Sequence, residues 1–214
     1  MGIRLTIAWL AVAAAVFARG ATAADIAATI RDSNGAPLAN AVVYAIPADG
    51  RPLPDHQPIG AVIDQVGAEF RPFVTPVEVG AEVVFTNADR FAHNIYSVFG
   101  ARVFEIALTR EVSAPPVPIE HSGVILLGCS IHDWMVAYVY AVPTRFLGKT
   151  DESGVAILRE LPVGQTEVYV WHPGVRGDGP LPRTIETFAN EIANIEFDLA
   201  LRPEPLWRLE RDAN

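Results

Sequence analysis

The segment Gly128-Cys129-Ser130-Ile131-His132-Asp133-Trp134-Met135 stands between two apolar runs of the chain. The runs are Val124–Leu127 and Val136–Val142, and their length and β-branched and aromatic content predict strands. The segment is therefore predicted to be a tight loop between two strands. On such a loop the spacing Cys-x2-His-x2-Met lets the side chains of Cys129, His132 and Met135 converge on one point.

The donor types on this loop favour copper. A thiolate and a thioether are soft ligands, and a thiolate with imidazoles and a weak thioether is the blue-copper arrangement. Zinc sites bring more Cys, His or carboxylate ligands and rarely Met. A two-copper centre would need a second bridging cysteine, whereas Cys129 is the only one in the chain.

A fourth ligand is predicted upstream, at His93. The predicted strand Glu82–Thr86 leads into a loop that ends in the pair His93-Asn94. A single histidine on such a loop is more often structural than metal-binding. Together with the downstream Cys-x2-His-x2-Met loop, however, His93 completes the donor set of a copper centre.

The stretch from about residue 70 to 142 resembles a cupredoxin. It contains the run Val-Glu-Val-Gly-x-x-Val-x-Phe-x-Asn over residues 77–87, followed by the His-Asn pair and the Cys loop. The resemblance implies a Greek-key sandwich with His93, Cys129 and His132 as equatorial ligands and Met135 as the axial ligand. It also implies that Asn94 braces the Cys loop by a hydrogen bond.

The short loop resembles that of amicyanin more than that of plastocyanin. Where amicyanin-like loops carry Pro after the ligand histidine, this chain has Asp133. The partner of amicyanin is therefore not carried over to this chain. Phe91 and Trp134 flank the predicted ligands, and they are interpreted either as an apolar docking rim or as simple packing.

The two ends of the chain resemble parts of a carboxypeptidase-regulatory-like, transthyretin-like β-sandwich. Gly35–Leu38 precedes the apolar run Ala41–Tyr44, and the turns Thr150–Gly154 and Pro162–Gly164 follow about 100 residues later. This implies a sandwich interrupted by the copper domain. The alternative is two domains in series.

The whole chain resembles exported proteins labelled methylamine utilisation protein, a label that establishes no role. The predicted domains are residues 1–23 (signal peptide), 24–58 with 143–200 (regulatory-like sandwich), 59–142 (cupredoxin-like copper domain) and 201–214 (C-terminal tail).

The remaining sequence predicts an all-β fold. Short β-rich runs alternate with Gly, Pro, Asn and Asp, and 17 prolines argue against long helices. One short helix is predicted over Thr187–Ile192. A hairpin-like unit is predicted over Asp25–Pro47, with its turn at Asp32–Gly35. The clearest predicted strands are Ala41–Ile46, Glu82–Thr86, Val124–Leu127, Val136–Val142, Val155–Leu158 and Glu167–Val170.

The N-terminus predicts export to the periplasm. Arg4 precedes the apolar run Leu5–Phe17, and Ala21-Thr22-Ala23 has the small-x-small pattern of a cleavage site, which predicts cleavage after Ala23. The run is shorter than the ~20 residues that span a bilayer, although an uncleaved anchor is the alternative. No later segment is long and apolar enough to span, so the mature chain is expected to have no stable membrane insertion.

The negative net charge argues against nucleic acid as a partner. Cleavage would remove two arginines and no acid, so the formal net charge of −9 would become about −11. Such a chain would be repelled by the phosphates of nucleic acid.

The predicted function is a periplasmic type-1 copper protein that shuttles electrons between redox proteins. An enzyme is not expected, because four protein ligands leave no open position for a substrate. The alternatives are a copper carrier or store and a non-redox interaction module.

Overall fold

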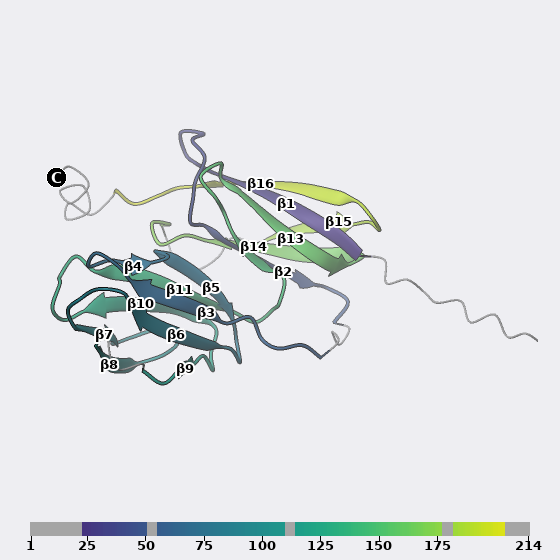
Figure 1. Ribbon diagram of the computed structural model, residues 1–214. Coiled ribbons are helices and arrows are strands. Elements are labelled where there is room, and N and C mark those ends of the chain that lie inside the picture. The colour runs from purple at the N-terminus through teal and green to yellow at the C-terminus, as the bar shows by residue number, and fades with distance from the viewer. Residues whose placement is uncertain (1–22, 51–54, 110–113, 177–181, 204–214) are drawn as a thin grey trace, which may run out of the picture.

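The computed structural model describes residues 23–50, 55–109, 114–176 and 182–203 (Figure 1). Every regular secondary-structure element in these ranges is a β-strand, which confirms the all-β prediction. They contain no helix that could cross a membrane. The predicted signal peptide lies outside the described residues except for Ala23, and residues 204–214 of the predicted tail also lie outside them.

The helix predicted over Thr187–Ile192 is wrong. Strand β15 (Arg183–Thr187) ends where this helix was expected to begin, and β16 (Ile192–Leu199) begins where it was expected to end. Between them the chain makes a tight turn, in which Glu191 N–H donates to the Phe188 carbonyl and Asn190 has a φ of 59°. A left-handed residue at this place is incompatible with a helix and is typical of asparagine in turns.

The central part of the chain forms two facing sheets, named the central sandwich (Figure 1). Their strand orders are β5-β11-β10-β7-β8 and β4-β3-β6-β9. Ile63 and Phe85 from one sheet and Ile95 and Val139 from the other are almost completely buried in a common core. The strands are β3 (Ala61–Gln65), β4 (Phe70–Arg71), β5 (Val74–Glu78), β6 (Glu82–Asn87), β7 (His93–Ser97), β8 (Phe104–Leu108), β9 (Val117–Pro118), β10 (Gly123–Cys129) and β11 (Val136–Val142).

Strands from both ends of the described chain form the outer sandwich. Its sheets have the orders β13-β1-β16 and β12-β2-β14-β15, and Ile30 and Phe197 lie in its core. The predicted domain boundaries are 24–58 with 143–200 for the regulatory-like sandwich and 59–142 for the copper domain. That these ranges are independent domains stays a prediction. Besides β15 and β16, the strands are β1 (Ala23–Asp32), β2 (Val42–Pro47), β12 (Leu147–Lys149), β13 (Val155–Pro162) and β14 (Gly164–Trp171).

The hairpin predicted over Asp25–Pro47 does not form as expected. The turn after β1 is closed, since Leu38 N–H donates to the Ile30 carbonyl. Strand β1 nevertheless pairs with β13 and β16, while β2 pairs with β12 and β14 in the opposite sheet. Asn40, with a φ of 63°, lies where the chain crosses from one sheet to the other. The turn was therefore predicted correctly and the pairing of the strands was not.

Strand β11 is buried on both of its faces. Ala137, Val139 and Ala141 point into the core of the central sandwich. Tyr138, Tyr140 and other alternate residues belong to a second apolar cluster, which contains residues of β2 and β14 of the outer sandwich. A strand covered on both faces reads as a continuous apolar run, which explains why the predicted bounds of this strand agree with the observed ones. This cluster packs the two sandwiches against one another at β11, the strand that follows the Cys loop. The two sandwiches lie next to one another in Figure 1.

Candidate metal centre

Strand pairing brings the two distant halves of the predicted site together. Strand β7 begins at His93 and β10 ends at Cys129, and the two strands pair antiparallel, with Cys129 opposite Ile95. The start of one strand and the end of the other therefore lie at the same end of the sheet. Beyond β10 the chain turns back through His132 to enter β11, so the three candidate ligands meet at this end.

Two separations among the three candidate ligand atoms match those around a bound metal ion. Cys129 Sγ lies 3.7 Å from Nδ1 of His93 and 3.8 Å from Nδ1 of His132. Bonds of about 2.3 Å to sulfur and 2.0 Å to nitrogen, the zinc values, place these atoms about 3.7 Å apart in a trigonal plane and closer together in a tetrahedron. These two separations therefore fit the sulfur and nitrogen ligands of a nearly trigonal ion, and this donor set suits copper.

Burial differs among the three candidate ligands. His93 and Cys129 are 1% and 3% exposed, whereas His132 is only partly buried. Two ligands are therefore shielded from water, and the His132 imidazole is the one that reaches towards the surface. A bound ion would be held in a largely apolar setting with one edge facing the solvent.

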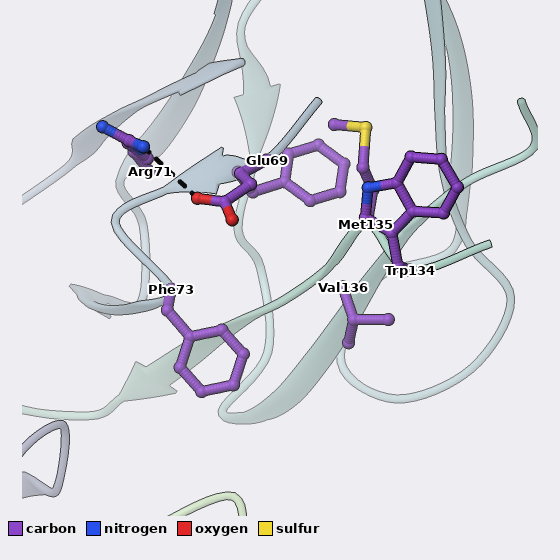
Figure 2. Close-up of a pocket in the computed structure, with 7 residues that line it drawn as sticks. Glu69, Arg71, Phe73, Trp134, Met135 and Val136 are labelled. Carbon is purple, nitrogen blue, oxygen red and sulfur yellow. Dashed lines mark hydrogen bonds and ion pairs between the residues drawn. The ribbon is translucent and has the colours of Figure 1, made fainter. Parts of the chain in front are cut away.

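Met135 lies in the same apolar core as Cys129 and is 1% exposed. Its backbone N–H donates to the His132 carbonyl at 3.0 Å, which closes the loop. Figure 2 shows its thioether beside the Trp134 indole, at the side of a cavity. The structure thus places Met135 next to the ligand loop, and its role as the axial ligand stays a prediction.

Asn94 connects β7 to the Cys loop. Its Nδ2 donates to Ser130 Oγ at 3.0 Å and to Glu105 Oε1 at 2.7 Å, and its carbonyl accepts the Ser130 N–H at 3.0 Å. Ser130 directly follows Cys129, so these bonds fix the loop at the position of the thiol. This is the geometry that a bracing role requires, and such contacts orient metal ligands.

Asp89 was missed by the sequence interpretation. Its Oδ2 lies 2.9 Å from Nε2 of His93, so the carboxylate holds the ring with Nδ1 directed at Cys129. Burial raises the pKa of Asp89, but the N–H groups of Ala68 and Gly67 and the contact with His93 lower it, and the net effect is a pKa below the ordinary value. The spacing Asp-x3-His was the only signal in the sequence. In an irregular loop, however, this spacing does not predict that the two side chains come into contact.

Aromatic side chains surround the exposed edge of His132. Its ring centroid is 5.5 Å from that of Phe91 and 5.3 Å from that of Trp134. Phe91, Ile131 and Trp134 are 48%, 55% and 45% exposed, which is high for large apolar side chains. The Trp134 indole is fixed in place because its Nε1–H donates to the Ala68 carbonyl. Both predicted rim residues thus lie beside the imidazole, and Ile131 extends the apolar surface.

Comparisons with known proteins gave likenesses among solved structures. No family model matches the chain, and no curated protein matches it. A Cu-containing nitrite reductase from Thermus scotoductus is 22% identical over 55% of this chain and 28% of its own, with a TM-score of 0.38. A purple cupredoxin from Nitrosopumilus maritimus is 27% identical over 38% of this chain and 99% of its own (TM-score 0.29). Amicyanin from Paracoccus versutus is 16% identical over 46% and 91% (TM-score 0.35).

Proposed function

We propose that this chain is an exported type-1 copper protein that carries single electrons between redox proteins. The observation that supports the proposal is the pair of 3.7 and 3.8 Å separations between Cys129 Sγ and the two histidine Nδ1 atoms. His93, Cys129 and His132 would be the equatorial ligands, and Met135 would be the axial one. Copper in such a site supplies one-electron chemistry at the thiolate–imidazole centre.

The residues around the ligands favour electron transfer over catalysis. Asp89 holds His93, and Asn94 holds the loop at Ser130, so the ligands are fixed before metal enters. A site fixed in this way changes little between the two copper oxidation states. With Met135 as the fourth ligand no position is open for a substrate, so we propose that the chain is not an enzyme.

The His132 imidazole is the proposed point of electron exchange. It is the ligand nearest the surface, and it lies within the apolar rim of Phe91, Ile131 and Trp134. A small rim of this kind suits a transient complex, because weak redox encounters use small interfaces. The partner would be another redox protein, and the predicted export signal would put the encounter in the periplasm.

Spectra of the copper-loaded protein test the proposal. We expect an intensely blue oxidised protein with the electron paramagnetic resonance signal of a thiolate-bound Cu(II). Cys129→Ser should abolish the colour because it removes the thiolate, while the neighbouring variant Ile131→Ala should retain it. A colourless Cu(II) protein would contradict the proposal. Rapid loss of copper to a chelator from a blue protein would instead favour a copper carrier.

A further inference from the structure

A column of aromatic rings runs from the side of the copper loop into the outer sandwich. Phe73 packs edge-on against Tyr138 at a centroid distance of 5.5 Å, and Tyr138 lies 5.8 Å from Trp171. Trp171 stacks on Tyr140 at 4.6 Å. The column therefore starts at Phe73, just before β5, and passes through Tyr138 of β11 to Trp171 of β14 in the outer sandwich.

The same column continues through the apolar cluster between the sandwiches to Tyr169 on β14. Tyr140 lies 6.2 Å from Tyr44, and Tyr44 stacks on Tyr169 at 4.9 Å. Tyr169 is partly exposed, and its hydroxyl donates to Glu167 Oε2 at 2.7 Å. We name this set the aromatic column; in order, its members are Phe73, Tyr138, Trp171, Tyr140, Tyr44 and Tyr169.

The first ring of the column borders a cavity beside the predicted axial ligand. Phe73, Trp134 and Met135 line this cavity, which has a volume of about 140 Å³ (Figure 2). A cavity of roughly 10–15 Å³ already holds a water molecule, so hydrogen peroxide can enter. An oxidant in this cavity would contact the Met135 thioether on one side and the column on the other.

Tyr44, Tyr140 and Tyr169 differ in whether a carboxylate can accept the phenolic proton. Tyrosine gives up an electron readily only if its phenolic proton has an acceptor. Burial raises the pKa values of Tyr44 and Tyr140, whose hydroxyls are hydrogen-bonded to one another, and no carboxylate is bonded to either hydroxyl among the described contacts. Tyr169 is bonded to the Glu167 carboxylate, which can take the proton when the ring is oxidised. Of these three tyrosines, Tyr169 is therefore the one whose oxidation the hydrogen bond to a carboxylate favours.

We propose that the aromatic column carries oxidising equivalents from the cavity beside Met135 to Tyr169 and so protects the copper ligands from peroxide. Copper held by His93, Cys129, His132 and Met135 would supply the one electron that splits hydrogen peroxide into hydroxide and a hydroxyl radical. The radical takes one electron from the column and becomes a second hydroxide. Tyr169 supplies that electron in the end, and its phenolic proton passes to Glu167. The products are a neutral tyrosyl radical and a protonated carboxyl group.

This inference rests on the proposed function, because the oxidant arises where copper is bound. The test starts from protein whose blue colour has been verified, so failure to bind copper is detected separately. The reduced, copper-loaded protein is treated with hydrogen peroxide, and two signals are followed. Electron paramagnetic resonance reports the tyrosyl radical, and mass spectrometry reports sulfoxide at Met135, the ordinary oxidation product of methionine.

Two variants interrupt the column at different places. Trp171→Phe should lower the yield of tyrosyl radical severalfold and raise sulfoxide at Met135 severalfold. Tyr169→Phe removes only the hydroxyl at the outer end and should also abolish the main radical signal, without disturbing the packing between the sandwiches. Tyr96→Phe changes a partly buried tyrosine outside the column and should leave both signals as in the parent protein.

An experiment with metal-free protein distinguishes protection by the aromatic column from direct oxidation of Met135 by peroxide. Peroxide alone oxidises Met135 by a two-electron reaction, so without copper the sulfoxide yield should be equal in the parent and Trp171→Phe proteins. If the Trp171→Phe and Tyr169→Phe proteins are blue but show the parent radical and sulfoxide yields, the column is only packing. A radical that persists in Tyr169→Phe and disappears in Tyr96→Phe would overturn the proposal as well.

Discussion

His93 contacts Asp89 and Cys129 through opposite nitrogens of one ring. Its Nε2 lies 2.9 Å from the Asp89 carboxylate, and its Nδ1 lies 3.7 Å from Cys129 Sγ. The carboxylate is itself held, since it accepts the N–H groups of Gly67 and Ala68. A loop between β3 and β4 therefore positions a candidate ligand that belongs to β7.

Asp89→Asn should weaken copper binding. The substitution keeps the size of the side chain and removes the charge that makes His93 a better donor, and losses of about 10–100-fold in metal affinity are typical for such contacts. Competition with a chelator of known affinity measures the effect. Asp133→Asn removes the same charge from an exposed position on the ligand loop and serves as the matched control. Equal losses in both variants would show that Asp89 acts only through its long-range charge.

Met135→Leu should leave the protein blue and raise its reduction potential. A weak axial thioether stabilises Cu(II) more than Cu(I), so its loss favours the reduced state, and the axial ligand is known to tune the potential. The swap nearly conserves volume and should cost less than about 1.5 kcal/mol of stability. Met135→Gln, with a harder oxygen donor, should shift the potential downwards. Voltammetry that gives one potential for all three proteins would rule out Met135 as a ligand.

The ligand loop could be predicted because its information is local. Cys129, His132 and Met135 are close in sequence, and they run from the last residue of β10 to the residue before β11, two strands whose apolar runs are plain. Strand β11 was predicted with its observed bounds since both of its faces are buried and its run has no polar interruption. Predictions of this kind need only the alternation of side chains along a strand and the chemistry of the candidate ligand atoms.

Other features depend on contacts that no local pattern reports. Strand β1 pairs in parallel with β16, more than 160 positions later, so the sequence around Asp32–Gly35 could predict the turn but not the partner. Asp89 contacts His93 only because the loop at Gly67 and Ala68 fixes the carboxylate. Tertiary pairing, rather than propensity, decided both outcomes.

Gly154→Ala should destabilise the protein much more than Gly35→Ala. Both glycines have a positive φ, 75° and 81°, so alanine at either costs about 1–2 kcal/mol of backbone strain. A Cβ on Gly35 would meet open space, whereas one on Gly154 would lie 2.5 Å from the Ile30 carbonyl oxygen and 2.9 Å from the Leu38 nitrogen. This overlap adds about 1–3 kcal/mol. Urea denaturation midpoints at constant slope measure both costs. Equal midpoints for the two variants would contradict the predicted overlap.

The turn at Asp151 should make stability depend on pH in the acid range. Hydrogen bonds from the Ser153 hydroxyl and the Val155 N–H lower the pKa of Asp151 below its ordinary value of 3.8. Because the folded-state pKa is depressed, this contribution to stability is complete above the unfolded pKa and is lost as the pH falls through the folded one. Asp151→Asn should therefore lower the melting temperature at pH 6, and the gap to the parent protein should narrow as the pH falls below about 4. Glu152→Gln removes an exposed carboxylate from the same turn and is the control. A gap that is independent of pH would mean that Asp151 stabilises the turn through its shape rather than its charge.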